Sequence, residues 1–220
     1  MFIGQYISTG YYEILPKDSI DFAIHKMNDY HVKQLSVVED GNFLGLIDED
    51  LLLDQEEGEK DISTLNLHYK QVYLFDYQHI YDALQVMALY NYCFIPVLNK
   101  EHHYLGVLTK QDLLSSLNST LGNDDGGAII VLELGIHDNA LSHIARIIEA
   151  ENTSILSTAV HALPESSKLE MTIKVNKNNI SAVVASLWRN NYTVKATFRD
   201  GSDSSDIQDR YDLLMNYLDL

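Results

Sequence analysis

The sequence repeats one pattern of apolar residues after a shift of 60 positions. In each copy, four apolar residues are spaced so that they share one face of a helix. They are Ile20, Ala23, Ile24 and Met27 in the first copy and Ile80, Ala83, Leu84 and Met87 in the second. Such a repeat limits the fold strongly, because one short copy cannot cover both sides of its own sheet. We therefore expect two similar halves that pack together about a pseudo-twofold axis.

The same elements follow each of these helices in the same order. Two β-rich runs joined by a polar turn are followed by a second helix. The runs span 35–38 and 43–47 in the first copy and 95–98 and 104–108 in the second. The closing helices are expected directly after Asp50 and Asp112. This mixture of helices and short strands predicts an α+β protein.

This order resembles the CBS repeat, in which a strand, a helix, two strands and a closing helix form a unit that pairs with its twin. The stretches that carry the resemblance are ILPKDSIDFAIHKMNDYHVKQLSVVEDGNFLGLIDEDLL and LFDYQHIYDALQVMALYNYCFIPVLNKEHHYLGVLTKQDLL. We assign repeat 1 to residues 1–60 and repeat 2 to residues 61–121. The resemblance implies a CBS-domain pair (a Bateman module) of two β-α-β-β-α repeats with pseudo-twofold symmetry, which leaves two clefts between them.

From residue 122 onward the pattern changes. A stretch rich in Gly and Asp at 122–127 is expected to be a linker. Residues 128–200 then predict the ferredoxin-like order β-α-β-β-α-β. The expected strands span 128–134, 153–163, 168–175 and 193–198, and the expected helices span 141–148 and 180–187. The details resemble an ACT domain, especially the stretch ENTSILS ahead of the second strand.

The resemblance to ACT domains also implies a ligand loop after the first strand, with the pattern D-x-x-G. Ile136 and Asn139 occupy these two positions, and either Asp138 or Asn139 is expected to cap the following helix. Asn tolerates the left-handed backbone that Gly provides, so the turn can be kept, but the acid is missing. Whether the domain binds an amino acid stays open. We expect it mainly to pair with a copy of itself by joining sheets, which predicts a homodimer.

The last segment, 201–220, is predicted to be an acidic C-terminal tail with a final helix from Ser204 onward. Its apolar residues fall on one helical face. They are Ile207, Tyr211, Leu214, Met215 and Leu218. Two alternatives remain for this face, which either packs on its own chain or forms part of a dimer contact.

The net charge of −17 is concentrated in two stretches. Residues 47–61 and residues 200–220 contain eight and six acidic residues, with one basic residue in each. Nucleic acids and anionic membranes attract Lys and Arg, so this balance argues against both as partners. The first stretch lacks the spacing of an EF-hand calcium loop. We interpret both stretches as solvated.

The CBS resemblance implies a ligand site in the cleft of repeat 2. Many CBS pairs bind adenine nucleotides through a Gly, two aliphatic residues, a Thr or Ser and, three positions later, an Asp. Here the motif runs from Gly106 through Thr109 to Asp112. A hydroxyl and the first N–H groups of a helix can bind phosphate, and a carboxylate accepts hydrogen bonds from ribose hydroxyls. The remaining positions implied by the family are Lys33 and Gln34, with His31 nearby, for the phosphate and Ile14 for the base.

The twin cleft is expected to be poorer. Asp48 replaces the Thr, the next acid is at Asp50, and the facing positions are Cys93 and Phe94. An acid where phosphate should bind is unfavourable. An alternative remains for the better cleft, because Thr109 and Asp112 are also residue types that cap a helix without any ligand. The few cations favour adenosine or AMP over ATP as the ligand.

The usual signatures of catalysis are missing from the sequence. The patterns GxSxG, HExxH, GxxxxGK[ST] and GxGxxG after a strand do not occur, and neither a metal site nor a catalytic residue is predicted. The single cysteine, Cys93, excludes an internal disulfide, and we interpret it as a small core residue. Neither a secretion signal nor a membrane span is predicted, so the chain is expected in the cytoplasm.

A CBS pair followed by an ACT-like domain is similar to the acetoin-utilisation regulatory family. The analogy implies a protein that senses a metabolite and transmits the signal to an unidentified protein partner. A ligand that bridges both repeats would favour one relative orientation of them. The rival hypotheses are a structural dimerisation module without a ligand and an enzyme whose active site carries no known motif.

Overall fold

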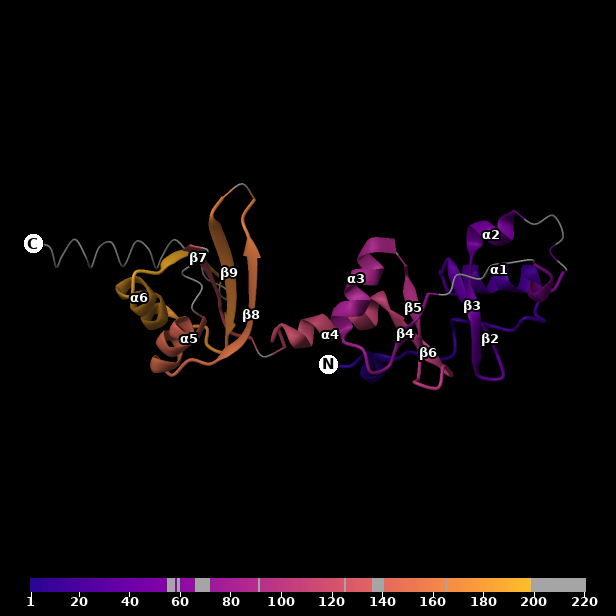
Figure 1. Ribbon diagram of the computed structural model, residues 1–220, viewed down its shortest axis with the longest axis horizontal. Coiled ribbons are helices and arrows are strands. Elements are labelled where there is room, and N and C mark those ends of the chain that lie inside the picture. Colours follow the sequence, from indigo (N-terminus) through magenta and orange to yellow (C-terminus); the bar gives the residue numbers. More distant parts are fainter. Residues whose placement is uncertain are drawn as a thin grey trace, which may run out of the picture. The chain divides into compact units, whose positions relative to one another are not determined.

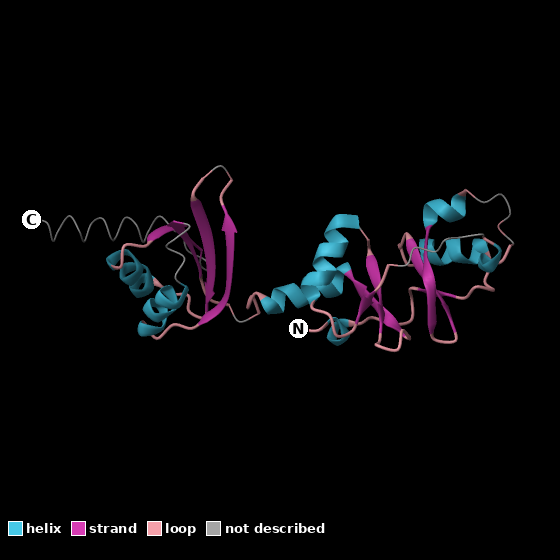
Figure 2. Cartoon of the chain, viewed as in Figure 1, coloured by secondary structure: helices cyan, strands magenta, loops and turns pink. Residues whose placement is uncertain are grey.

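The computed structural model describes residues 1–54, 58, 60–65, 72–90, 92–124, 126–135, 141–164 and 166–198. The chain forms two compact units, Met1–Leu117 and Asn118–Leu220 (Figure 1). Each unit combines helices with antiparallel strand pairs (Figure 2), which confirms the α+β class. The two units are described separately below.

The first repeat contains a three-stranded sheet in the order β1-β2-β3. β1 runs parallel to β2, and β3 is antiparallel to β2. The first helix begins after Ser19, whose hydroxyl accepts a hydrogen bond from the N–H of Phe22 at 3.1 Å and so caps the helix. The elements are β1 (Glu13–Ile14), α1 (Ile20–Asp29), β2 (Gln34–Glu39), β3 (Asn42–Asp48) and α2 (Glu49–Leu53).

The second repeat has the same elements and the same sheet, in the order β4-β5-β6. Met27 of the first repeat and Met87 of the second are both buried at equivalent places, each in the core of its own repeat. The repeated apolar pattern therefore predicted two like half-domains correctly. The elements are β4 (Leu74–Phe75), α3 (Ile80–Tyr90), β5 (Phe94–Leu98), β6 (Tyr104–Thr109) and α4 (Lys110–Thr120).

The two closing helices begin earlier than expected from the sequence. α2 begins at Glu49 and α4 begins at Lys110, so that Asp50 and Asp112 lie inside the first turn rather than ahead of it. The reason is local, because Asp48 and Thr109 occupy the end of each preceding strand and make the capping hydrogen bonds. Asp112 is thereby placed on the first turn of α4.

The segments that precede the two repeats are exchanged between them. Ile3, in the 3-10 helix η1 (Ile3–Tyr6), is buried in the core of the second repeat. Ile62, in η2 (Ile62–Thr64), is buried in the core of the first. The N–H of Ile3 donates to the carbonyl oxygen of Gln78, and the N–H of Ile62 donates to that of Asp18, both at 2.9 Å. The two acceptors are 60 positions apart, so they are equivalent residues of the two repeats. The expected boundary at residue 60 assigns residues to the repeats in chain order and therefore does not show this exchange.

Equivalent residues of the two repeats meet at their common interface. Leu46 and Val107 pack together with Phe94 in a buried cluster. The rings of Phe43 and Tyr104 stack with centroids 6.3 Å apart and an interplanar angle of 13°. Contacts between equivalent positions are what a pseudo-twofold axis produces, so the two repeats share one interface, as the apolar repeat predicts.

The second unit contains a four-stranded antiparallel sheet in the order β10-β7-β9-β8. Two helices cover one face of this sheet (Figure 2), and their buried residues include Ile144, Ile147 and Ile148 on one helix and Val183, Val184 and Leu187 on the other. The predicted order β-α-β-β-α-β is present. The elements are β7 (Ile129–Gly135), α5 (Leu141–Ala150), β8 (Ile155–Ala162), β9 (Lys168–Val175), α6 (Ser181–Arg189) and β10 (Thr193–Phe198). Ile136, Asp138, Asn139 and the tail 201–220 lie outside the described residues.

Candidate functional site

Strand β6 places the side chain of Thr109 on the face that meets the first repeat. Leu108 is fully buried in the core of the second repeat, whereas Val107 belongs to the interface cluster. Because side chains alternate along a strand, Thr109 lies on the same face as Val107. The hydroxyl of Thr109 and the first turn of α4 therefore lie beside the interface between the repeats.

Thr109 and Asp112 form a reciprocal hydrogen-bonded turn at the start of α4. Oδ2 of Asp112 accepts hydrogen bonds from the N–H of Thr109 at 3.0 Å and from its hydroxyl at 2.6 Å. In return, the N–H of Asp112 donates to the Thr109 hydroxyl at 3.1 Å. The capping role foreseen for these residues is thus present. It leaves Oδ1 of Asp112 without a hydrogen-bond partner among the residues that the structure describes.

Ser8 also binds Asp112, although nothing in the sequence pattern indicated it. Its hydroxyl donates to Oδ2 of Asp112 at 3.0 Å, across 104 positions of the chain. Its backbone exchanges two hydrogen bonds with Val107, at 2.8 and 2.9 Å. Gly106 allows this close approach, because a Cβ there would lie 2.5 Å from the Ser8 carbonyl oxygen. The N-terminal segment, residues 3–8, therefore ends at the candidate cleft.

Tyr12 is a second residue that the sequence pattern did not indicate. Its ring contacts Phe94 of the other repeat with centroids 4.9 Å apart. Burial raises the pKa of the Tyr12 hydroxyl, and the negative charge of Asp112 raises it further. The backbone carbonyl of Tyr12 accepts a hydrogen bond from the N–H of Ser36 at 2.7 Å, which fixes it to strand β2. Tyr12 thus contributes an aromatic surface close to Asp112.

Gln34 reaches across the interface from the first repeat. It is 8% exposed, and its Oε1 accepts a hydrogen bond from the N–H of Cys93 at 3.3 Å. The next residue, Phe94, is paired with Thr109 in the β5–β6 ladder. The structure therefore places Gln34 near the strand end that carries Thr109.

The other expected site residues are placed less directly. The side chain of Lys33 is 80% exposed and lies 3.7 Å from Glu49. His31 is exposed, with a φ of 53°, in the turn after α1. Ile14 is 2% exposed and packs in the core of the first repeat. Within the described part of the chain, none of these three side chains has a direct hydrogen bond to Thr109 or Asp112.

The twin cleft has the same backbone but other side chains. Asp48 caps α2 by accepting a hydrogen bond from the N–H of Leu51 at 3.3 Å, as Thr109 does for Asp112. Leu51, rather than Asp50, therefore stands at the position of Asp112. The first turn of α2 thus carries an apolar side chain where the second repeat has its carboxylate.

Comparisons with known proteins show the family to which these repeats belong. The sequence model of the CBS domain matches residues 3–56 and 65–119. A CBS domain-containing protein of Dictyostelium discoideum is 31% identical over 134 residues, which cover 54% of this chain and 92% of the relative. The chain belongs to the CBS domain family. Each of the two ranges that the sequence model matches corresponds to one of the repeats described above.

Solved structures are also similar to about half of the chain, at lower identity. A CBS domain pair/ACT domain protein of Thermotoga maritima is 18% identical, with a TM-score of 0.50, over 55% of this chain and 99% of that protein. The protein CBSX2, solved in complex with AMP, is 17% identical, with a TM-score of 0.46, over 54% of this chain and 96% of that one.

Among the described residues, no three His, Cys, Asp or Glu side chains gather where a metal ion could bind. In the same part of the chain, no helix is both long and apolar enough to span a bilayer.

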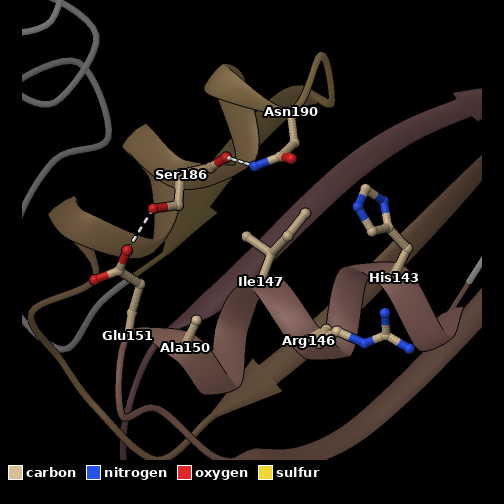
Figure 3. Close-up of a pocket in the computed structure, with 7 residues that line it drawn as sticks. All are labelled: His143, Arg146, Ile147, Ala150, Glu151, Ser186 and Asn190. Carbon is tan, nitrogen blue, oxygen red and sulfur yellow. Dashed lines mark hydrogen bonds between the residues drawn. The ribbon is translucent and has the colours of Figure 1, made fainter.

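A shallow groove in the second unit is a separate hollow (Figure 3). It has a volume of about 350 Å³ and lies between α5 and α6. At one end, the Ser186 hydroxyl donates to Glu151, and Arg189 donates to the same hydroxyl at 2.6 Å. At the other end, His143 is hydrogen bonded to Tyr192 at 2.7 Å. The side chains of Ser186, Glu151 and His143 are thus already bonded within the domain.

Proposed function

We propose that the CBS pair is a regulatory, non-catalytic module that binds adenosine or AMP in the cleft of the second repeat. The observation that carries the proposal is the free Oδ1 of Asp112 among the described residues, at a helix start that lies beside the interface between the repeats. A carboxylate oxygen without a partner can accept a hydrogen bond from a ribose hydroxyl. A cap that served only the helix would not need this position beside an aromatic ring of the other repeat.

The remaining groups of the ligand are assigned to named side chains. The ring of Tyr12 is the surface that we propose for the base, since the side chain of Ile14 is already packed in the core. Lys33 and His31 are exposed, so both can rotate toward a phosphate, and Gln34 lies near the strand end that carries Thr109. With a net charge of −17, the chain favours adenosine or AMP over the more highly charged ATP.

The proposed signal follows from the position of the cleft. A ligand that contacts Asp112 of one repeat and Tyr12 of the other favours one relative orientation of the two repeats. In the manner of the acetoin-utilisation regulators that the chain resembles, this change would pass to a protein partner in the cytoplasm, through a homodimer formed by the ACT-like domain.

The two capping carboxylates provide a matched test. Asp112→Ala removes a cap and the proposed ligand contact, whereas Asp48→Ala removes only a cap. Each should lower the free energy of unfolding by about 1 kcal/mol. Binding of adenosine and AMP, measured by titration calorimetry and by the thermal shift at saturation, should weaken at least about tenfold in Asp112→Ala and stay unchanged in Asp48→Ala. Equal affinities in both variants, or no binding by the wild type, would reject the proposal.

A structural dimerisation module remains the second candidate, because one edge of the sheet in the second unit is open. β8 pairs only with β9 among the described residues, and Val160 on β8 is 45% exposed. Lys on an edge strand opposes pairing with another strand. Val160→Lys should therefore convert a dimer into a monomer in light scattering, with Leu89→Lys, 70% exposed on α3, as the control. A dimer that binds no adenine compound supports this candidate alone.

A further inference from the structure

We propose that Ser8 is a further residue of the ligand site and that a ligand hydroxyl replaces the Ser8 hydroxyl on Asp112, which loosens the N-terminal segment at its Ser8 end. The inference rests on the proposed function of the cleft. It assigns to residues 3–8 a role in reporting whether the cleft is occupied.

The hydrogen bonds of Asp112 are distributed unevenly. A carboxylate offers about four lone-pair sites over its two oxygens. Oδ2 accepts three hydrogen bonds, from the N–H and hydroxyl of Thr109 and from the hydroxyl of Ser8. The two from Thr109 are short-range and belong to the turn that starts α4. A ribose offers two neighbouring hydroxyls, of which one can donate to the free Oδ1. The second can reach Oδ2 by replacing Ser8, the donor that can leave without unwinding the helix.

The N-terminal segment is attached to the second repeat at both ends, and in between Tyr6 and Ile7 pack against the core of that repeat. Ile3 is buried in the core of that repeat, and the N–H groups of Ile3 and Gly4 donate to Gln78 and Asp76 at 2.9 and 2.8 Å. At the other end, Ser8 is partly exposed and bonds only to Val107 and Asp112 among the described residues. Loss of the bond to Asp112 therefore removes one of the two anchors at this end.

The chain then crosses from one repeat to the other within a few residues. Gly10 is exposed with a φ of 98°, and Tyr11 is 56% exposed. Tyr12 already contacts the ring of Phe94, and Glu13 begins β1 in the sheet of the first repeat. Movement of Ser8 away from Asp112 is thus passed directly to the strand that enters the first repeat. Binding of a ligand in the cleft therefore changes the segment that connects the two repeats.

The test combines affinity with amide hydrogen exchange on the full chain, with adenosine as the probe. In the wild type, saturating adenosine should protect residues 109–112 and speed the exchange of residues 3–8 about tenfold, the ratio that loss of one charge-assisted hydrogen bond gives. In Ser8→Ala, residues 3–8 should exchange fast before adenosine is added. Adenosine should also bind about three- to tenfold more tightly, because no hydroxyl has to leave Asp112.

Ser19→Ala is the matched control, because it also removes one serine hydrogen bond, the cap of α1, away from the cleft. It should change neither the affinity nor the exchange of residues 3–8. Adenosine binding that protects residues 3–8, or that weakens in Ser8→Ala, overturns the proposed replacement and leaves the ligand site standing. Absence of binding in both the wild type and Ser8→Ala overturns the ligand site and, with it, this role of Ser8.

Discussion

The first and second repeats of the CBS pair have the same hydrogen-bonding register but different side chains at the cleft. The N–H of Glu49 donates to Lys33 O, and the N–H of the equivalent Lys110 donates to Cys93 O, both at 3.0 Å. Within this shared frame, the second repeat carries the carboxylate of Asp112 where the first carries Leu51. The backbone depends on buried apolar residues that both repeats keep, so the ligand-binding side chains of one copy can change without loss of the fold.

The first way to sharpen this comparison is to truncate both core methionines. Met27 is 1% exposed and Met87 is 4% exposed, each in the core of its own repeat. Met27→Ala and Met87→Ala should each lower the free energy of unfolding by about 3 kcal/mol, since each leaves a cavity of the same kind. Urea denaturation followed by circular dichroism measures both values.

The exposed Leu89 on α3 serves as the control for this pair, and Leu89→Ala should change stability by less than about 0.5 kcal/mol. If one methionine variant loses much more stability than the other, the two cores are not equivalent. The pseudo-twofold description of the pair would then be wrong at the level of energetics.

The second way is to disrupt the contact between the N-terminal segment, residues 3–8, and Gly106 of the second repeat. Gly106 has a φ of 141°, and a Cβ there would lie 2.5 Å from the Ser8 carbonyl oxygen. Gly106→Ala should therefore lower the free energy of unfolding by about 2 kcal/mol, from backbone strain and from the steric clash together. Gly10, with a φ of 98°, has open space around its Cβ position.

Gly10→Ala is accordingly the control, because it carries the backbone strain alone and should cost about 1 kcal/mol. Exchange of residues 3–8, measured by mass spectrometry, should rise in Gly106→Ala and stay near the wild type in Gly10→Ala. Equal stability losses in the two variants would mean that the contact between Gly106 and Ser8 contributes nothing.

The sequence predicted those features that depend on local periodicity. The apolar spacing located Met27 and Met87, whereas the start of α4 was expected after Asp112 and lies at Lys110. The contact between Ser8 and Asp112 could not be predicted in this way, because it joins residues 104 positions apart and has no periodic signal.

Two other features could not be predicted from the sequence, for related reasons. The exchange of Ile3 and Ile62 between the cores involves 3-10 helices that are too short to show a helical period. The equivalence of Leu51 with Asp112 depends on which N–H bonds to Asp48, and an alignment of acidic residues pointed to Asp50 instead. Register is a property of the hydrogen bonds and is not visible in composition.

The mildest prediction compares Tyr104 with Phe43, its equivalent in the first repeat, on which it stacks. Burial raises the pKa of Tyr104 above its ordinary value of about 10, the charge of Glu13 raises it further, and the Ser36 hydroxyl lowers it in part. A raised pKa in the folded state means that the neutral phenol stabilises the fold below about pH 10. This stability is lost as the pH rises from there toward the folded pKa.

Tyr104→Phe places the side chain of the first repeat in the second and removes this titration. At neutral pH it should change the free energy of unfolding by no more than about 1 kcal/mol, since only one hydroxyl is lost. Above about pH 10, stability should fall less steeply than in the wild type, as measured by urea denaturation at each pH.

The pKa of Tyr12 is also raised, so part of the fall in stability with pH should remain until Tyr12→Phe is added. If Tyr104→Phe kept the wild-type slope, the partly buried phenol would not distinguish the two repeats, and their difference would be confined to the cleft.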